Sequence, residues 1–436
     1  MRITVFALVL AAALAAPARP QQKYAVVDSL GLPGGHKDSS MFSGLYAARD
    51  GMVYIGSSIH GGSAQFYKYD PRSGRVAHIA GMGEFLGQTG RGVRVAGKIH
   101  TRFVEDRQGR IYFATMCEDS GPTNIDPYSW EGPHWMRYDP RAGKVENLGS
   151  INRLWGAYGL AIDGQRNRLF ATTWDGRLYR YDIDEGRTHD LGRVDNWDDA
   201  RHIAADDEGN VYGPYPNARI WKYDARTERV HDLSVQFPYD HLVFPRRMSN
   251  PMLDRKAIWR VVDWDPVDRV LYGVDGSSSL LFKYGPRDGP EGKATFLARL
   301  CAERFIESDR KDIPFSTLAF TIGKDRKIYH AATGFDFDYE ARLESTELAR
   351  QRGDPRAISY TELIAYDLKT RRRENLGMLR TRDGAHVFGC GAATCGPDGT
   401  VYFVGGVEEK DPAKAAGKTG GVAPYALRLM MYRAGK

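Results

Sequence analysis

The chain has 436 residues, of which 42% are apolar, 11% aromatic and 27% charged. This is the composition of a folded globular protein, and it excludes a disordered chain. The formal net charge of +6 is compatible with an anionic ligand. No run of lysine and arginine residues indicates a nucleic-acid partner.

The first 18 residues have the pattern of a signal peptide. Arg2 precedes an apolar stretch over residues 3–16, and Ala16, Pro17 and Ala18 form a small-x-small cleavage site. The apolar stretch is too short to span a bilayer comfortably, and no later stretch is long enough. We therefore expect a periplasmic or secreted protein without a membrane anchor, whose mature chain is residues 19–436.

The strand that follows, over residues 24–30, lies apart from the repeats that make up the rest of the chain. Its sequence resembles the last strand of those repeats, and the last repeat stops after its third strand, near Tyr432. We expect residues 24–30 to complete that repeat and close a ring, which also removes exposed sheet edges.

A repeat of four short strands occurs seven times. The second strands begin at Val53-Tyr54, Ile111-Tyr112, Leu169-Phe170, Val211-Tyr212, Leu271-Tyr272, Ile328-Tyr329 and Val401-Tyr402. The third strands end near Tyr69, Tyr138, Tyr181, Tyr223, Tyr284, Tyr366 and Tyr432. Alternating β-branched and aromatic residues between Asp, Pro and Gly turns are strand signals. The sequence predicts one all-β domain over residues 19–436, a seven-bladed β-propeller of four-stranded blades.

Four cysteines allow three disulfide pairings, which the sequence leaves open. They are Cys117, Cys301, Cys390 and Cys395. Cys390 and Cys395 lie in one predicted strand at odd spacing, so their side chains should point to opposite faces and not pair with each other. The absence of a C-x-x-C pair argues against a structural zinc ribbon.

One face of the predicted propeller carries all the long insertions. They cover residues 117–133, 237–257, 334–359 and 407–424. Long loops on a rigid scaffold usually carry function, so we place the functional site on this face.

The starts of the innermost strands indicate which residues converge there. Counting back from the second strands, the equivalent positions hold Phe42, His100, Tyr158, Ala200, Arg260, Thr317 and Cys390. The next position inward holds Ser43, Thr101, Gly159, Arg201, Val261, Leu318 and Gly391. A histidine, a tyrosine and two arginines therefore meet at one end of the channel. Each of these residues also has a purely structural alternative. His100 could cap a strand, Tyr158 could be a packed aromatic ring, and the two arginines could form ion pairs with acids such as Asp199.

Further candidates lie at the ends of second strands and in the loops of the same face. These are His60, Glu118, His134, Trp135, Trp174 and His202. Trp174 is suited either to stacking on a sugar ring or to a place in the core. His134 begins a third strand on the functional face.

With His100 opening one inner strand and Tyr158 opening the next, the sequence resembles the propeller polysaccharide lyases, of which the ulvan lyases are the best example. The resemblance covers nearly the whole mature chain. The arginine of the family follows its tyrosine within one blade, where this chain has Trp174, so Arg201 of the neighbouring blade would substitute. The second histidine of the family is matched most nearly by His134.

The resemblance implies an exported lyase that cleaves a uronate-containing anionic polysaccharide by β-elimination. Arg201 and Arg260, with His100 or His134, would hold the carboxylate and stabilise the enolate-like state. Tyr158 would remove the proton beside the carboxylate. Such a site requires no cofactor, and we expect a monomer. The sequence leaves open whether a structural zinc or calcium ion is bound among the cysteines and histidines.

Other classes of function compete with the lyase. The main alternative is a non-catalytic propeller that binds glycans or proteins, since a fold does not imply a function. A metal-dependent hydrolase or lactonase would need acids at the strand starts, where this chain has none. Clustered His-x-His ligands of the metal-using oligogalacturonide lyases are missing, and the eight tryptophans are too irregular for a quinone-cofactor propeller.

Overall fold

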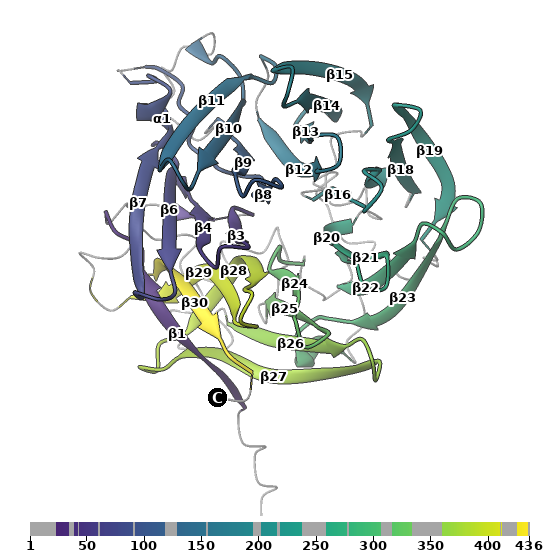
Figure 1. Ribbon diagram of the computed structural model, residues 1–436. Helices are drawn as coiled ribbons and strands as arrows, with labels where there is room; N and C mark the ends of the chain where they lie inside the picture. The colour runs from purple at the N-terminus through teal and green to yellow at the C-terminus, as the bar shows by residue number, and fades with distance from the viewer. Residues whose placement is uncertain are drawn as a thin grey trace, which may run out of the picture.

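The computed structural model describes residues 23–34, 39–41, 43–59, 62–89, 92–117, 129–153, 156–194, 202–215, 219–237, 259–276, 279–306, 316–333, 360–409, 411 and 425–434. The predicted signal peptide and most of each long insertion lie outside these ranges. Figure 1 shows β-sheets arranged radially around a common centre, as a propeller requires. No helix in the described ranges is long and apolar enough to cross a membrane.

Five blades are separate four-stranded sheets whose strands follow chain order. The first contains β3 (Leu45–Ala47), β4 (Val53–Gly56), β6 (Gln65–Asp70) and β7 (Arg75–Gly81). The second contains β8 (Val104–Glu105), β9 (Ile111–Ala114), β10 (His134–Asp139) and β11 (Lys144–Ser150). The third contains β12 (Ala157–Asp163), β13 (Arg168–Thr173), β14 (Arg177–Asp182) and β15 (Arg187–Arg193).

The next two blades follow the same order. The fourth contains β16 (Ala204–Ala205), β17 (Val211–Tyr215), β18 (Arg219–Asp224) and β19 (Arg229–Gln236). The fifth contains β20 (Trp259–Asp265), β21 (Val270–Asp275), β22 (Leu280–Gly285) and β23 (Lys293–Arg299). Smaller elements are the two-stranded pair β2 (Ser39–Ser40) and β5 (Ser58–Ile59), the helix α1 (Met82–Phe85) and the 3-10 helix η2 (Glu303–Phe305).

The remaining strands form one eight-stranded sheet, in the order β24, β25, β26, β27, β1, β30, β29, β28. Their bounds are β24 (Phe320–Ile322), β25 (Lys327–Thr333), β26 (Thr361–Asp367), β27 (Arg372–Thr381), β1 (Tyr24–Gly31), β30 (Tyr425–Tyr432), β29 (Val401–Glu408) and β28 (Val387–Cys395). The first half of β1 pairs in parallel with β27, and its second half pairs antiparallel with β30.

This pairing corrects the predicted blade count. The prediction of seven separate blades is wrong, because the structure has five four-stranded blades and one eight-stranded sheet. The physical reason is β1, which forms hydrogen bonds on both of its sides and so joins strands that the repeat places in different blades. The predicted closure of the ring is confirmed by the antiparallel pairing of β1 with β30 (Figure 1).

A recurring hydrogen bond explains why tyrosine begins so many second strands. The tyrosine hydroxyl donates to an aspartate in the preceding turn, as in Tyr112 to Asp106 at 3.0 Å and Tyr212 to Asp206 at 3.0 Å. The same Asp106 accepts the backbone N–H of Arg110 at 2.9 Å. In these two blades the aspartate therefore fixes the turn and satisfies a buried hydroxyl at once.

The core lies between neighbouring blades, where large rings from adjacent sheets meet. Phe66 of β6 packs on Phe103 and Phe113 of the second blade, with ring centroids 5.4 and 5.1 Å away. All three rings are buried. The four cysteines carry free thiols, and burial raises the pKa of Cys301 to about 11, so this thiol stays protonated.

Candidate functional site

The innermost strands surround the central axis of the propeller, which we call the channel (Figure 1). They are β3, β8, β12, β16, β20, β24 and β28. The strand pairing shows which positions of different blades are equivalent. Val104 pairs with Tyr112 and Asp263 pairs with Tyr272, so Val104 and Asp263 occupy the same position in their blades. His100 and Arg260 stand four and three residues before these positions. We call the end at the strand starts the mouth, and define it by His100, Tyr158, Trp174 and Arg260.

Three aromatic rings form a continuous cluster at the mouth. The ring centroids of His100 and Tyr158 lie 5.1 Å apart, and those of Tyr158 and Trp174 lie 4.9 Å apart, both tilted. His100 and Tyr158 are only 2% and 6% exposed, whereas Trp174 is half-buried. Tilted aromatic pairs at these separations attract beyond their buried area. The cluster is therefore a packed platform that presents Trp174.

Arg260 is held in the wall of the mouth by the neighbouring sheet. Its Nε donates to the backbone carbonyl of Ser316 at 3.2 Å. The hydroxyl of Ser316 lies 2.9 Å from the hydroxyl of Ser279. The guanidinium is buried, so its position is set by the fold and not by a flexible side chain.

The other predicted site residues are placed separately. His134 is buried at the start of β10, and burial lowers the pKa of its imidazole. Its nearest charged group is Glu131 at 4.0 Å. No contact between His134 and the mouth is recorded among the described residues. His60 and Arg201 lie outside the described ranges, as do Phe42, Ala200 and Glu118.

Two contacts cross the channel below the mouth. The Nε2 atom of His202, in the fourth blade, lies 3.2 Å from the hydroxyl of Ser43, in the first. Arg102, which precedes β8, forms an ion pair with Asp263 of β20 and donates to the carbonyl of Val262 at 3.0 Å. These cross-channel contacts tie inner strands on opposite sides of the propeller together.

Arg102 and Asp263 were not among the predicted site residues. Burial raises the pKa of the Asp263 carboxyl, and the Arg102 guanidinium acts against this rise. Arg102 stands two residues after His100 in the segment that leads into β8, and in extended chain side chains two positions apart share a face. This spacing from His100 is the feature of the sequence that could have identified Arg102 as a channel residue. The partner on β20 could not be found from it, because the pairing joins residues 161 positions apart.

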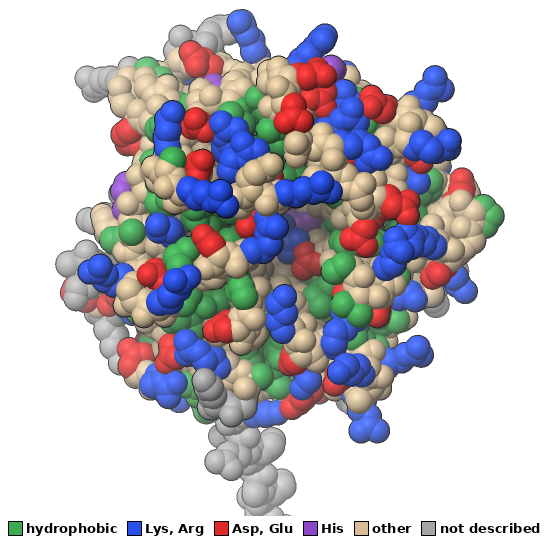
Figure 2. All heavy atoms as spheres, viewed as in Figure 1, with side chains coloured by type: hydrophobic (Ala, Val, Ile, Leu, Met, Phe, Trp, Pro, Cys, Tyr) green, Lys and Arg blue, Asp and Glu red, His purple; other side chains and the backbone are tan. Residues whose placement is uncertain are grey.

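A cavity of about 280 Å³ lies toward the ends of the inner strands. We call it the channel cavity, and it is lined by Leu45, Tyr46, Arg102, Phe103, Val104, Glu105, Leu160, Ala161, Ile162, Ile203, Ala204, Ala205, Asp263, Trp264, Thr321, Ala393 and Thr394. Glu105 accepts a hydrogen bond from the Tyr46 hydroxyl at 3.1 Å and pairs with Arg49 at 3.0 Å. Figure 2 shows a hollow near the centre of the viewed face, with side chains of both charges around it.

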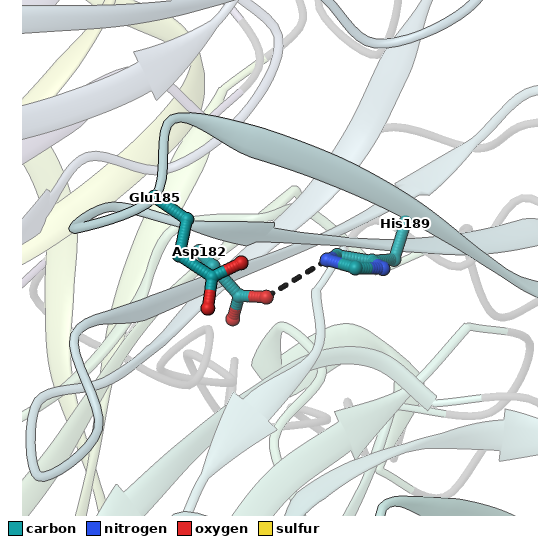
Figure 3. Close-up of side chains that lie close together, drawn as sticks. All are labelled: Asp182, Glu185 and His189. Atoms are coloured by element: carbon teal, nitrogen blue, oxygen red, sulfur yellow. Dashed lines mark ion pairs between the residues drawn. The ribbon is translucent and has the colours of Figure 1, made fainter.

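A further cluster among the described residues contains acidic and histidine side chains. Asp182, Glu185 and His189 lie close together at the outer part of the third blade (Figure 3). The oxygens of Asp182, however, already meet Arg168 at 2.9 Å and Arg180 at 3.0 Å. Two guanidinium groups neutralise this carboxylate and would repel a zinc or calcium ion. These residues therefore do not fit a metal site.

Comparison with known proteins supports the fold class. No protein-family model and no curated protein matches the chain. Among solved structures, a chain of a mitotic checkpoint complex matches with TM-score 0.53 and 12% identity, covering 100% of this chain and 99% of that chain. The RRP9 WD40 repeats match with TM-score 0.56 and 12% identity, covering 95% and 99%. U3-55K matches with TM-score 0.54 and 11% identity, covering 92% and 98%.

The radial sheets, the inner-strand channel and these similarities define the protein as a β-propeller with four-stranded blades. At such low identity the similarities concern the fold alone. What the site does has to be argued from its own residues.

Proposed function

We propose that this protein is a non-catalytic β-propeller that binds an anionic glycan at the mouth of its channel. The observation that carries the proposal is the aromatic cluster, in which Trp174 is presented on a platform of Tyr158 and His100. The half-buried ring of Trp174 on this rigid base suits the C–H face of a sugar. The buried Arg260 supplies a cation of fixed position in the same wall, and a guanidinium is the natural fork for a carboxylate or sulfate.

The burial of the mouth residues favours binding over catalysis. A general base has to come within about 2.6–3.2 Å of the proton that it removes. His100 and Tyr158 are 2% and 6% exposed and pack against each other. Their accessible neighbour is Trp174, which has no acid–base chemistry.

A second candidate is the polysaccharide lyase, and one observation favours it. The imidazole of His100 and the ring of Tyr158 are neighbours, with centroids 5.1 Å apart. This is the His/Tyr pair that β-elimination from a uronate would use. Under either proposal, we propose that the protein is exported and monomeric.

One experiment separates the candidates. The purified protein is incubated with ulvan, pectate, alginate and glycosaminoglycans, and binding is measured by calorimetry while ultraviolet absorbance follows unsaturated uronate. Binding without absorbance, weakened in Trp174→Ala, is the expected result. Absorbance that is lost in both Tyr158→Phe and His100→Ala would establish the lyase. If the folded protein neither binds nor cleaves any polymer, the glycan proposal is wrong and a protein partner becomes the better hypothesis.

A further inference from the structure

The channel cavity is a second site, separate from the mouth. Its lining residues come from all seven inner strands, and its volume of about 280 Å³ is near the lower limit of small-molecule sites, roughly 300–1,000 Å³. The strand β12 passes from Tyr158 at the mouth to Ile162 at the cavity, and four strand residues span about 13 Å. The Arg102–Asp263 ion pair belongs to the wall of the cavity, and the His202–Ser43 contact lies beside Ile203 of that wall.

Each charged side chain of the cavity wall has an ion-pair partner, either in the wall or at its rim. Of its lining residues, Arg102 pairs with Asp263, and Glu105 pairs with Arg49 at the rim. An anionic or cationic ligand would leave one charge uncompensated in a partly buried site, which is costly. The balance therefore selects a ligand without net charge.

The wall also offers hydrogen bonds that the fold leaves unused. Thr321 is 6% exposed, and its hydroxyl has no hydrogen-bond partner among the described residues. As a hydroxyl it can both donate and accept. The carboxylate of Glu105 accepts from the Tyr46 hydroxyl and from the backbone and guanidinium of Arg49, which leaves about one of its roughly four acceptor positions. A ligand with several hydroxyl groups meets both requirements.

Apolar residues also line the cavity. They include Leu160, Ile162 and Ile203 with small alanines beside them, and Trp264 adds an aromatic ring. Trp264 is held by a hydrogen bond from its Nε1 to Asp207 at 2.9 Å. Hydroxyl-binding groups and C–H-binding surfaces in one cavity match a sugar ring, which has both kinds of surface.

We propose that the channel cavity binds one neutral monosaccharide-sized polyol, with Thr321 and Glu105 contacting its hydroxyl groups. The site does not rest on the function proposed for the mouth, because the two share no residue. Binding is measured by calorimetry on the full protein with glucose, galactose, mannose and mannitol, and with glucuronate and glucosamine as charged counterparts. At least one neutral compound should bind about tenfold more tightly than both charged ones.

Three variants test the residues. Thr321→Val keeps the shape and removes the hydroxyl, so the affinity should fall about fivefold or more, and Thr321→Ser should restore it. Asp263→Asn leaves the Arg102 charge unbalanced, so the preference should shift toward glucuronate. Trp174→Ala at the mouth should leave neutral-sugar binding unchanged. Thermal unfolding of each variant verifies that it is folded.

The proposal is overturned by any of three results. The first is that none of the neutral compounds binds, which would mean that the cavity holds water only. The second is that the unmodified protein binds a charged sugar more tightly than the neutral ones. The third is that the folded Thr321→Val variant has an unchanged affinity. A failure of polysaccharide binding at the mouth would leave this proposal standing, because the mouth variant and the cavity variants report on different sites.

Discussion

The mouth and the channel cavity are built from the same inner strands, yet they differ in chemistry. At the mouth, aromatic rings pack against each other and present Trp174. At the cavity, charged side chains from opposite blades neutralise each other. The difference shows that one repeated scaffold can carry two unlike environments. Positions a few residues apart in a strand meet different partners across the axis.

Removing the cross-channel ion pair should have the largest effect. Arg102→Met leaves the half-buried Asp263 carboxylate without its partner, which should cost about 2–3 kcal/mol in the free energy of unfolding. Because burial already raises the pKa of Asp263, the carboxyl can escape this cost by protonation, so the loss should be smaller at pH 5 than at pH 8. Urea unfolding at both pH values measures it.

The matched control is Arg187→Met, which removes an exposed arginine and should change stability by less than about 0.5 kcal/mol. An Arg102→Met protein as stable as the control at pH 8 would show that the ion pair does not hold the cavity together.

Acid should weaken the wall of the cavity through His330. This residue of β25 is fully buried, its Nδ1 lies 3.1 Å from the carbonyl of Ala319, and burial lowers its pKa to about 4. The folded state holds the imidazole neutral, while the unfolded chain takes up a proton below about pH 6.5. Stability should therefore fall as the pH drops from 6.5 toward 4, by on the order of 2 kcal/mol at pH 5.

The measurement compares unfolding free energies between pH 5 and pH 8 for the unmodified protein, His330→Leu and the exposed-histidine control His231→Asn. A pH slope that is the same in His330→Leu and in the control would refute the prediction. Because His330 pairs with Phe320 of β24 beside Thr321, neutral-sugar binding should weaken before polysaccharide binding as the pH falls.

Exchanging the tryptophans should separate the two sites. Trp174→Ala removes the exposed ring at the mouth and should weaken polysaccharide binding about tenfold, or about 1.4 kcal/mol. Trp264→Ala should weaken binding only in the cavity. Calorimetry of both variants with one polysaccharide and one neutral sugar gives four values. If either variant lost affinity equally for the polysaccharide and for the neutral sugar, the two regions would act as one site.

The smallest effect is expected from the neutral cross-channel contact. Ser43→Ala removes the hydroxyl that lies 3.2 Å from His202, which should cost about 1 kcal/mol of stability and leave both affinities unchanged. Thermal unfolding measures the shift. A loss as large as that of Arg102→Met would show that the two contacts across the channel are energetically equivalent.

Local patterns predicted the blades and the mouth because both depend on neighbours in sequence. The tyrosine at the start of a second strand and the aspartate of the preceding turn stand six residues apart in Tyr112 and Asp106. Such a motif repeats and can be counted. The adjacency of His100 and Tyr158 followed from aligning the same motif across blades.

The parts that sequence reasoning missed depend on contacts without a repeat. Nothing in residues 24–27 indicates a parallel pairing with β27, so the union of two groups of strands into one sheet was not foreseen. Likewise, Asp263 stands where other blades have Val104 or Thr321, and only the closed ring brings it to Arg102. The long insertions that directed attention to the mouth carry no information about the cavity.

The position of β1 sets a time order on the making of this protein. Asp28 pairs with Arg382, 354 positions later, and with Arg433, 405 positions later. At about 5–20 residues per second, a ribosome needs roughly 20–70 seconds to supply the first of these partners. Throughout that interval both edges of the strand lack their hydrogen-bonding neighbours. The ring can close only after β30 has been synthesised and has left the ribosome, and the nascent chain has to be kept from pairing with other chains until then.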